Sequence, residues 1–479
     1  ILQLLGVEYA TIVMTKIDRV TQDHLAASIK AVQQLLENTC FSQSPIFSVD
    51  SLSGTGIETL AKHLWRLRPR QQSLDGEYFR LAIDRRFSIK GSGLVVTGSV
   101  FSGKAEVNGE LMVAPLAKAK TTRVRVRGLH RQDTASSFAG MGDRCAVNLA
   151  GDIELDDIKR GQWLSNHPAL PVSNRLDIEV TLLPGEHTPA KTGLPVHVHL
   201  AAQHTTGRLF LLDQRQLAPG ESALAQIVCE SEISGCFGDR LVLRDQSASR
   251  TLAGGKVVNP YSVKKGRSKP NRIRQLEYLA ALESKQALNL EVLLELAPDG
   301  LDLQQLANAM NSPAAETPFP VDEQSLSYHP NQIAELGQRV LDAIANGALN
   351  HRQLRQSLGI RESLFKLIVQ TLSASKKIVV SGNEINLPGK DNSLTGPAAT
   401  LWKKVEPILV QSDLQPPVLH ELAKQVNLPA PAVEKLLDSC VKQGLLVRPV
   451  KNRFFLPDTL NNIRQQAMAV ADAEGGRFT

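Results

Sequence analysis

The spacing of apolar and polar positions changes twice along the chain, and each change predicts a different kind of structure. Residues 9–15 (YATIVMT) form a continuous β-branched apolar run, which predicts a buried parallel strand. From about residue 78 to 260, short runs rich in Val, Ile and Thr alternate with Gly-containing turns, which is typical of β-barrels rather than βαβ units. After residue 274 the apolar positions recur at helical spacing. We therefore expect an α/β segment, then a β region, then a helical region.

The β region divides at the Pro- and Asn-containing segment SNHPALPVSN, residues 165–174. Such residues favour loops and are poorly tolerated inside strands. The sequence therefore predicts two barrels in tandem. Their expected strands are LAIDRRF, GLVVTGSV, ELMVA, TTRVRVRGLH and DRCAVNLAG, followed by RLDIEVTLL, PVHVHLA, GRLFLLD, ALAQIVC and DRLVLRDQS.

The helical region repeats itself. Leu354 begins a helical apolar pattern that Leu422 repeats 68 residues later, and the segments NEINLP and NRFFLP that follow are offset by 69. A fixed offset of this kind indicates a structural repeat. Each copy predicts two helices followed by a two-stranded hairpin, which is the winged-helix pattern. The second helix is expected at 362–372 in one copy and at 432–443 in the next. A looser copy covers residues 288–311, and a last predicted helix at 459–471 begins a fourth unit.

Polar residues follow the apolar run at the start of the chain and form a candidate guanine site. Asp18 comes at the carboxyl end of the predicted strand, where open α/β sheets bind ligands, and it can accept two hydrogen bonds that adenine cannot donate together. Lys16 would cover the face of the base with its aliphatic stem. After a predicted helix (24–37), a second strand ends in Ser-Val-Asp, where the Val49 N–H would meet the guanine carbonyl. The expected site comprises Thr15, Lys16, Asp18, Ser48, Val49 and Asp50.

A phosphate-binding loop is not visible. Gly98 to Lys104 has the glycine spacing of a P-loop, but Ala105 stands where the Mg²⁺-binding hydroxyl is needed, and the segment lies between two predicted strands. The chain also opens at Ile1 inside an apolar segment. We therefore expect a fragment of a GTPase that lacks the phosphate- and Mg²⁺-binding half, is inactive in hydrolysis by itself, and has no assigned catalytic residue.

Composition limits the remaining choices. No apolar run approaches the length of about 18 residues that a membrane span needs. Five scattered cysteines without paired spacing indicate reduced thiols of a cytoplasmic protein, and no set of metal ligands is predicted. The net charge of +6 is modest, but residues 264–274 (KKGRSKPNRIR) carry six basic residues and no acidic one. This segment is either a solvated linker or a linker that also contacts RNA phosphates.

Three stretches carry a family resemblance. FRLAIDRRFSIKGSGLVVTGSVFSGKAEVNGEL resembles the second domain of elongation factor Tu-like translational GTPases, and DRLVLRDQSASRTLAGGKVV resembles the closing strands of their third domain. Asp84-Arg85 with Phe87, the segment RGLH at 127–130, and Thr15 in place of an Asn are similar to the selenocysteine-specific elongation factors, the SelB family.

The resemblance implies a GTP-dependent factor that carries selenocysteyl-tRNA to the ribosome at UGA codons marked by an mRNA hairpin, with GTP and Mg²⁺ as cofactors in the intact protein. It assigns the selenocysteine pocket to Asp84, Arg85 and Arg127, because guanidinium groups favour an ionised selenol over a neutral hydroxyl. The alternative is that these residues form a surface ion pair and a solvated strand position. The resemblance also implies a cytoplasmic monomer whose wing residues contact RNA: Lys442, Arg448, Lys451 and Arg453.

The expected fold is therefore multidomain: a partial α/β P-loop GTPase domain, two β-barrels and an array of α+β winged-helix domains. Its expected boundaries are 1–72, 76–170, 173–262, 270–327, 328–390, 395–457 and 458–479. Two other functions stay open. One is a different tRNA-delivering translational GTPase, and the other is a winged-helix nucleic-acid-binding regulator with a vestigial GTPase domain.

Overall fold

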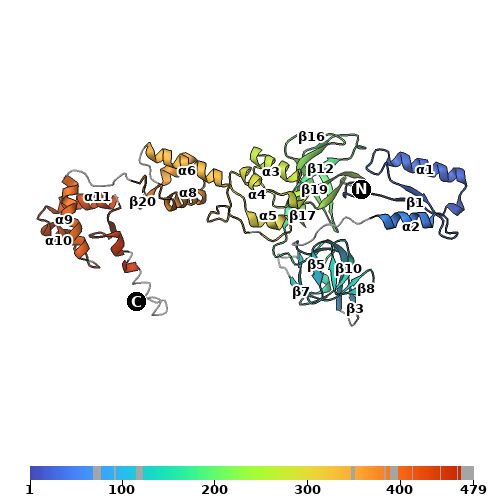
Figure 1. The fold of residues 1–479 in the computed structure, drawn as a ribbon, viewed down its shortest axis with the longest axis horizontal. Helices are drawn as coiled ribbons and strands as arrows, with labels where there is room; N and C mark the ends of the chain where they lie inside the picture. The colour runs from blue at the N-terminus through green and yellow to red at the C-terminus, as the bar shows by residue number, and fades with distance from the viewer. Residues whose placement is uncertain are drawn as a thin grey trace. The chain divides into compact units, whose positions relative to one another are not determined.

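The computed structural model divides the chain into two compact units, Ile1–Phe319 with Leu326–Tyr328, and Pro320–Ser325 with His329–Thr479. Figure 1 follows the order of elements through both units. The described residues are 1–67, 77–90, 93–114, 122–314, 316–346, 351–381, 384–388, 397–412, 414–442, 444–460 and 462–464. Within these ranges no helix is long and apolar enough to cross a membrane.

The first unit begins with a small α/β segment. Strand β1 (Ile12–Met14) pairs in parallel with β2 (Ile46–Ser48), and helix α1 (Gln22–Leu36) connects them. Thr21 caps α1 by accepting a hydrogen bond from the His24 N–H. Helix α2 (Ile57–Arg66) follows β2, and its His63 lies 3.0 Å from the Thr11 hydroxyl beside β1. The strand predicted at 9–15 is shorter in the structure and is not buried, since Tyr9 and Val13 are 86% and 37% exposed.

The first barrel contains the strands β3 to β11, and all five strands predicted for it are present. The pairing of β10 with β7 closes the order β10-β4-β3-β11-β6-β7, and β8 adds to β7. Alternate residues, such as Val124 and Val126 on β7, fill the core. The strands are β3 (Arg80–Ile89), β4 (Gly93–Ser102), β5 (Lys104–Glu106), β6 (Glu110–Ala114), β7 (Thr122–Arg131), β8 (Thr134–Ser136), β9 (Phe138–Gly140), β10 (Arg144–Ala150) and β11 (Trp163–Ser165).

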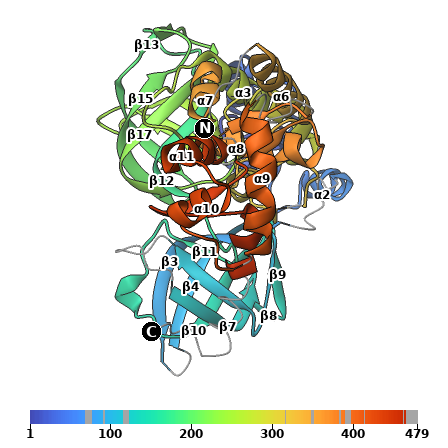
Figure 2. The same ribbon diagram turned by 90° about the vertical axis from the view of Figure 1, so that its left-hand side faces the viewer.

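The second barrel is closed in the order β12-β17-β15-β14-β18-β19. Its core includes Leu176, Ile178 and Val198, and it also contacts Ala82 and Trp163 of the first barrel. Its strands are β12 (Val172–Leu182), β14 (Leu194–Leu200), β15 (Gln203–Leu211), β17 (Ser222–Ser234), β18 (Arg240–Arg244) and β19 (Thr251–Asn259), with a ribbon of β13 (Ala190–Lys191) and β16 (Gln216–Leu217). Figure 2 shows the two barrels from another side.

A helical module completes the first unit and shares a core with the second barrel. Helices α3 (Pro270–Ala280), α4 (Leu290–Glu295) and α5 (Leu303–Ala309) supply Leu276, Leu293 and other residues that pack on Leu224 and Val258 of that barrel. Asn311, fully buried and with a φ of 57°, follows α5 and donates to the Tyr78 carbonyl (2.8 Å) and the Ser102 hydroxyl (2.9 Å) of the first barrel. The module therefore packs on the second barrel and is hydrogen-bonded to the first.

The second unit contains the repeat. Helices α6 (Pro330–Ala345), α7 (His351–Leu358) and α8 (Glu362–Ala374) precede the β20–β21 hairpin (Val379–Ser381, Glu384–Asn386). Helices α9 (Pro397–Gln411), α10 (Leu419–Gln425) and α11 (Ala430–Lys442) precede the β22–β23 hairpin (Val447–Val450, Arg453–Phe455).

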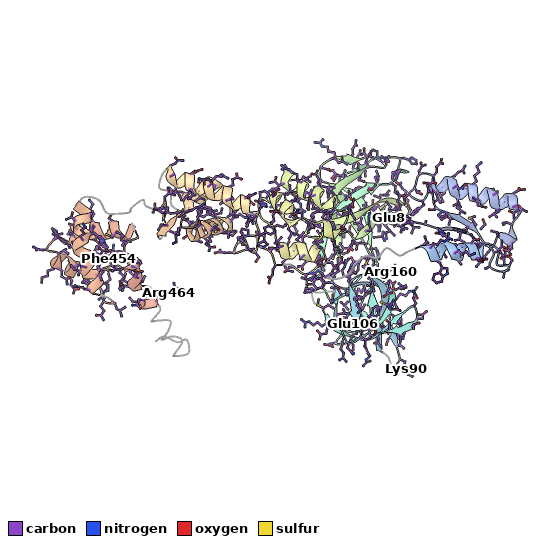
Figure 3. The ribbon with its side chains drawn as sticks, in the orientation of Figure 1. Glu8, Lys90, Glu106, Arg160, Phe454 and Arg464 are labelled. Carbon is purple, nitrogen blue, oxygen red and sulfur yellow. The ribbon has the colours of Figure 1, made fainter. Side chains whose placement is uncertain are left out.

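Equivalent residues of the two copies have equivalent burial. Leu354 and Leu422 are 0% and 1% exposed, and Ile385 and Phe454 are each 1% exposed. Figure 3 shows Phe454 inside the last helical bundle. The helix predicted at 459–471 lies mostly outside the described residues.

Candidate functional site

The predicted guanine residues lie at the carboxyl ends of the two parallel strands. Thr15, Lys16 and Asp18 are exposed, and Lys16 adopts the left-handed conformation (φ 59°) as the chain leaves β1. The pairing of Met14 with Ser48 brings the loop after β2 beside them. The structure therefore places both predicted halves of the site on one edge of the sheet.

The loop after β2 is held in one conformation. The Asp50 carboxylate is buried and accepts hydrogen bonds from the Leu52 and Ser53 N–H groups, each at 2.9 Å. Hydrogen bonding by Ser53, and then by the Leu52 and Ser53 backbone, holds the pKa of Asp50 below its usual value. Gly56 (φ 75°) passes so close to the Ser48 carbonyl that a Cβ there would lie 2.2 Å from it. Only glycine fits that position.

One contact expected at this site is wrong. The Val49 N–H, predicted to meet the guanine carbonyl, donates to the Met14 carbonyl at 2.8 Å. Parallel pairing uses this donor in the sheet, and Val49 itself is buried.

Asp84 lies on the outer wall of the first barrel at a bulge in β3. Ile83 pairs with Gly98 and Arg85 with Thr97, so Asp84 is the extra residue. Its carboxylate accepts from the Thr97 hydroxyl (2.8 Å) and forms an ion pair with Arg144 of β10. Burial opposes ionisation of Asp84, but the hydrogen bonds from Arg144 and Thr97 and the charges of Arg144 and Arg85 outweigh it and lower its pKa.

The three predicted pocket residues come from two strands of the first barrel. Arg85 is exposed beside Asp84 on β3. Arg127 comes from β7, and its guanidinium reaches the start of β4, where a Cβ on Gly93 would lie 3.9 Å from it. Arg144, which sequence reasoning missed, is the arginine in contact with Asp84. The available signal was the alternation in GDRCAVNLAG, which places Arg144 on the outer face opposite Ser99. Nothing in the sequence gives the register between β10 and β4.

The predicted RNA-binding residues of the last hairpin differ in their environments. Arg448 is held inside its own module: it donates to the Lys451 carbonyl (2.8 Å) and to Asp438 (2.9 Å), and lies 4.9 Å from the Phe454 ring centroid. Lys451 and Arg453 are exposed. Lys442 ends α11.

The basic segment at 264–274 is partly fixed on the second barrel. Arg267 stacks on Phe210 with 4.4 Å from its central carbon to the ring centroid, and Arg272 forms an ion pair with the fully buried Asp177. Asp177 also accepts from the Ser262 hydroxyl at 2.6 Å. Lys264 and Lys265 stay exposed. Across the ranges that the structure describes, no three His, Cys, Asp or Glu side chains form a group that could hold a metal ion.

The comparisons with known proteins agree with this architecture. Residues 93–165 match the family model of elongation factor Tu domain 2, and residues 177–264 match that of the selenocysteine-specific elongation factor β-barrel domain. The selenocysteine-specific elongation factor of Escherichia coli (strain K12) is 31% identical over 475 residues, covering 96% of this chain and 74% of the relative. That of Desulfomicrobium baculatum is 28% identical, covering 97% of this chain and 76% of the relative.

A crystal structure of the bacterial selenocysteine-specific elongation factor EF-Sec has the same fold. It matches with a TM-score of 0.60 at 19% identity, covering 95% of this chain and 82% of that one. Two closed barrels in tandem, the first matching elongation factor Tu domain 2, define a translation elongation factor of the elongation factor Tu class. Within that class, the chain belongs to the family of selenocysteine-specific elongation factors.

Proposed function

We propose that this protein delivers selenocysteyl-tRNA to ribosomes in the cytoplasm, at UGA codons marked by an mRNA hairpin, using GTP. Family membership supports the delivery of this tRNA. The observation that carries the proposal is the charged group on the first barrel, in which Arg85 and Arg144 flank the single carboxylate of Asp84.

The charges of this group fit an ionised selenol. With two guanidinium groups and one carboxylate, the group carries a net charge of +1 when Asp84 is ionised. A selenolate would neutralise it, whereas the serine hydroxyl would not. A charge-assisted hydrogen bond is worth about 1.5–3 kcal/mol, or roughly 10- to 150-fold in affinity. Asp84 keeps Arg144 in place and prevents an excess of positive charge.

The test compares selenocysteyl-tRNA and seryl-tRNA binding to the wild type, Arg85→Ala and Arg144→Ala. We expect each substitution to weaken selenocysteyl-tRNA binding by at least about tenfold and to leave seryl-tRNA binding nearly unchanged. Arg215→Ala, at an exposed position of the second barrel, is the matched control. Equal losses for both tRNAs would show that the arginines bind the tRNA backbone rather than the amino acid.

The α/β segment supports a guanine half-site made of Thr15, Lys16, Asp18, Ser48 and Asp50. Asp18 is exposed and available to the base, and the fixed 50–56 loop would border it. GTP, when bound, would supply the phosphates whose hydrolysis times tRNA release. In a protein that also carries a phosphate-binding half, Asp18→Asn should replace the preference for guanine with a preference for xanthine, because the amide donates where xanthine has a second carbonyl. Competition between GDP and XDP measures this, and unchanged guanine preference would refute the half-site.

We further propose that α6–α8 with β20–β21, and α9–α11 with β22–β23, are winged-helix domains, and that α3–α5 form a divergent third. The exposed Lys451 and Arg453 support an RNA contact at the last hairpin. Arg448 supports that hairpin from inside the module instead. The mRNA hairpin is the RNA partner that family membership favours.

A further inference from the structure

Strand β4 lies between the two strands that supply the charged group of the first barrel. Asp84 comes from β3 and Arg144 from β10, and β4 is hydrogen-bonded to both strands. Figure 2 shows β4 between β3 and β10. Because neighbouring strands lie about 4.8 Å apart, the backbones of β3 and β10 are roughly 10 Å from each other. The two charged side chains therefore meet across the outer face of β4.

Thr97 and Ser99 are the residues that β4 presents on this outer face. Val96 and Val100, at the alternate positions, are 0% and 3% exposed and belong to the core, whereas Thr97 is half-buried and Ser99 is exposed. Ser99 pairs directly with Arg144. Its small side chain leaves the path from Arg144 to β3 open. Thr97 is one position nearer the bulge in β3.

The Thr97 hydroxyl fixes the carboxylate of Asp84. One carboxylate oxygen accepts from that hydroxyl at 2.8 Å, and the other accepts from the Arg144 guanidinium. Asp84 is the extra residue of the bulge, so the regular alternation of the strand does not determine its direction. Threonine is β-branched and rotates little about χ1, which makes its hydroxyl a rigid donor. Thr97 therefore supplies the fixed point from which Asp84 holds Arg144.

We propose that Thr97 is a positioning residue for the choice between selenocysteine and serine, a proposal that rests on the function proposed above. Thr97 acts through Asp84, whose carboxylate it holds in the direction that fixes the Arg144 guanidinium. Without the hydroxyl the carboxylate turns freely, and Arg144 has to be ordered when the amino acid binds. Ordering one long side chain on binding weakens affinity roughly 2- to 12-fold.

A packing role for Thr97 is the competing explanation, and two substitutions separate it from the proposed role. Valine keeps the shape of threonine and removes the hydroxyl, whereas serine keeps the hydroxyl and removes the methyl group. Burial opposes ionisation of Asp84, and hydrogen bonds from Arg144 and Thr97 lower its pKa. Loss of the hydroxyl should therefore raise the pKa of Asp84, and loss of the methyl group should not.

The experiment compares the 479-residue wild type with Thr97→Val, Thr97→Ser and a matched control. The control, Thr134→Val, removes an exposed threonine hydroxyl from β8 of the same barrel. The first measurement is the pH titration of the Asp84 carboxyl carbon by NMR on protein labelled with carbon-13 aspartate, with Asp84→Asn to assign the signal. The second is the ratio of the affinities for selenocysteyl-tRNA and seryl-tRNA, with Arg144→Ala as the reference for loss of the pocket.

We expect Thr97→Val to move the Asp84 titration to higher pH and to lower the preference for selenocysteyl-tRNA roughly 2- to 12-fold. Thr97→Ser should restore most of both properties, and Thr134→Val should change neither. An unchanged Asp84 titration in Thr97→Val, or equal effects of Thr97→Val and Thr97→Ser, would overturn the proposal.

The reference variant separates this proposal from the proposed function. If Arg144→Ala lowers the preference for selenocysteyl-tRNA and Thr97→Val does not, Thr97 has no positioning role and the pocket stands. If Arg144→Ala also leaves the preference unchanged, the pocket itself is refuted, and the role of Thr97 in specificity is refuted with it.

Discussion

Arg80 and Asp239 join the two barrels through a bidentate ion pair that water barely reaches. Both guanidinium-to-carboxylate distances are 2.8 Å, and the two side chains are 3% and 7% exposed. Burial disfavours the charge of Arg80, but the carboxylate of Asp239 raises its pKa above the usual value. The Trp163 ring centroid lies 4.9 Å from the guanidinium carbon, and Asp239 also accepts from the Cys236 N–H at 2.8 Å.

Breaking this pair on one side should therefore be costly. Asp239→Asn leaves an uncompensated buried guanidinium, and we expect the first unit to lose about 3–5 kcal/mol of unfolding free energy. The double substitution Arg80→Met/Asp239→Leu should recover most of that loss. Denaturant unfolding measures both variants. The control is Lys62→Ala, which removes an exposed ion pair with Glu58 and should lower the unfolding free energy by less than about 1 kcal/mol. A loss for Asp239→Asn no larger than the control would contradict this account.

A second prediction separates Arg127 from Arg144. Arg144→Ala should reduce the preference for selenocysteyl- over seryl-tRNA, because Arg144 contacts Asp84. Arg127→Ala should leave that ratio unchanged, since the side-chain partners of Asp84 are Thr97 and Arg144 and not Arg127. Parallel binding curves with the two aminoacyl-tRNAs measure the ratio. If only Arg127→Ala lowered the preference for selenocysteyl-tRNA, Arg127 would belong to the pocket, as predicted from the sequence.

A third prediction concerns acid. His167 is fully buried, and burial, aided by the charge of Arg80, lowers its pKa to about 4. Its Nδ1 accepts from the Ala169 N–H at 3.0 Å, which leaves Nε2–H to donate to the Asn308 carbonyl at 3.2 Å. The unfolded chain binds this proton near pH 6.5 and the folded protein only near pH 4. The stabilisation is therefore complete above pH 6.5 and is lost as the pH falls toward 4.

The loss attributable to His167 should reach about 3 kcal/mol. Urea unfolding of the first unit at several pH values, with His167→Gln for comparison, measures it. The variant should be less stable at neutral pH, because it loses packing against Tyr78, but its stability should fall less steeply between pH 6.5 and 5. Parallel curves for variant and wild type would show that another group titrates.

A fourth prediction separates the residues of the last hairpin. Arg448→Ala should destabilise its module by about 1–3 kcal/mol, because it removes hydrogen bonds to Lys451 and Asp438. Lys451→Gln/Arg453→Gln should change stability by less than about 0.5 kcal/mol and instead reduce the salt dependence of binding to the mRNA hairpin. Thermal unfolding and salt titrations distinguish the two. Equal destabilisation by both variants would mean that Lys451 and Arg453 are structural.

The sequence predicted helices and strands well where one face of the element lies entirely in the core. Val124 and Val126 alternate with arginines because one face of β7 is core, and Leu354 and Leu422 share a spacing because both modules bury the same helix face. These features need only the residues beside them.

Features that depend on register or on distant partners could not be predicted. Asp84 is the extra residue of a bulge in β3 and meets Arg144 of β10 across β4. Val49 loses its free N–H because β2 pairs with β1 in one particular register. Arg448 resembles a solvent-facing wing cation in the sequence, and only the folded module shows Asp438 and Phe454 around it.

The turn at Asn311 determines where the protein can be truncated. A shortened protein that ends after the second barrel, near residue 262, would lack Leu276, Leu293 and Met310. The apolar surface around Leu224 and Val258, which these residues cover, would then be exposed. Such a product should aggregate on expression. A product that continues through residue 312 keeps both the apolar cover and the Asn311 contacts with Tyr78 and Ser102. The shortest well-behaved version of the barrels therefore includes a helical module that is not part of either barrel.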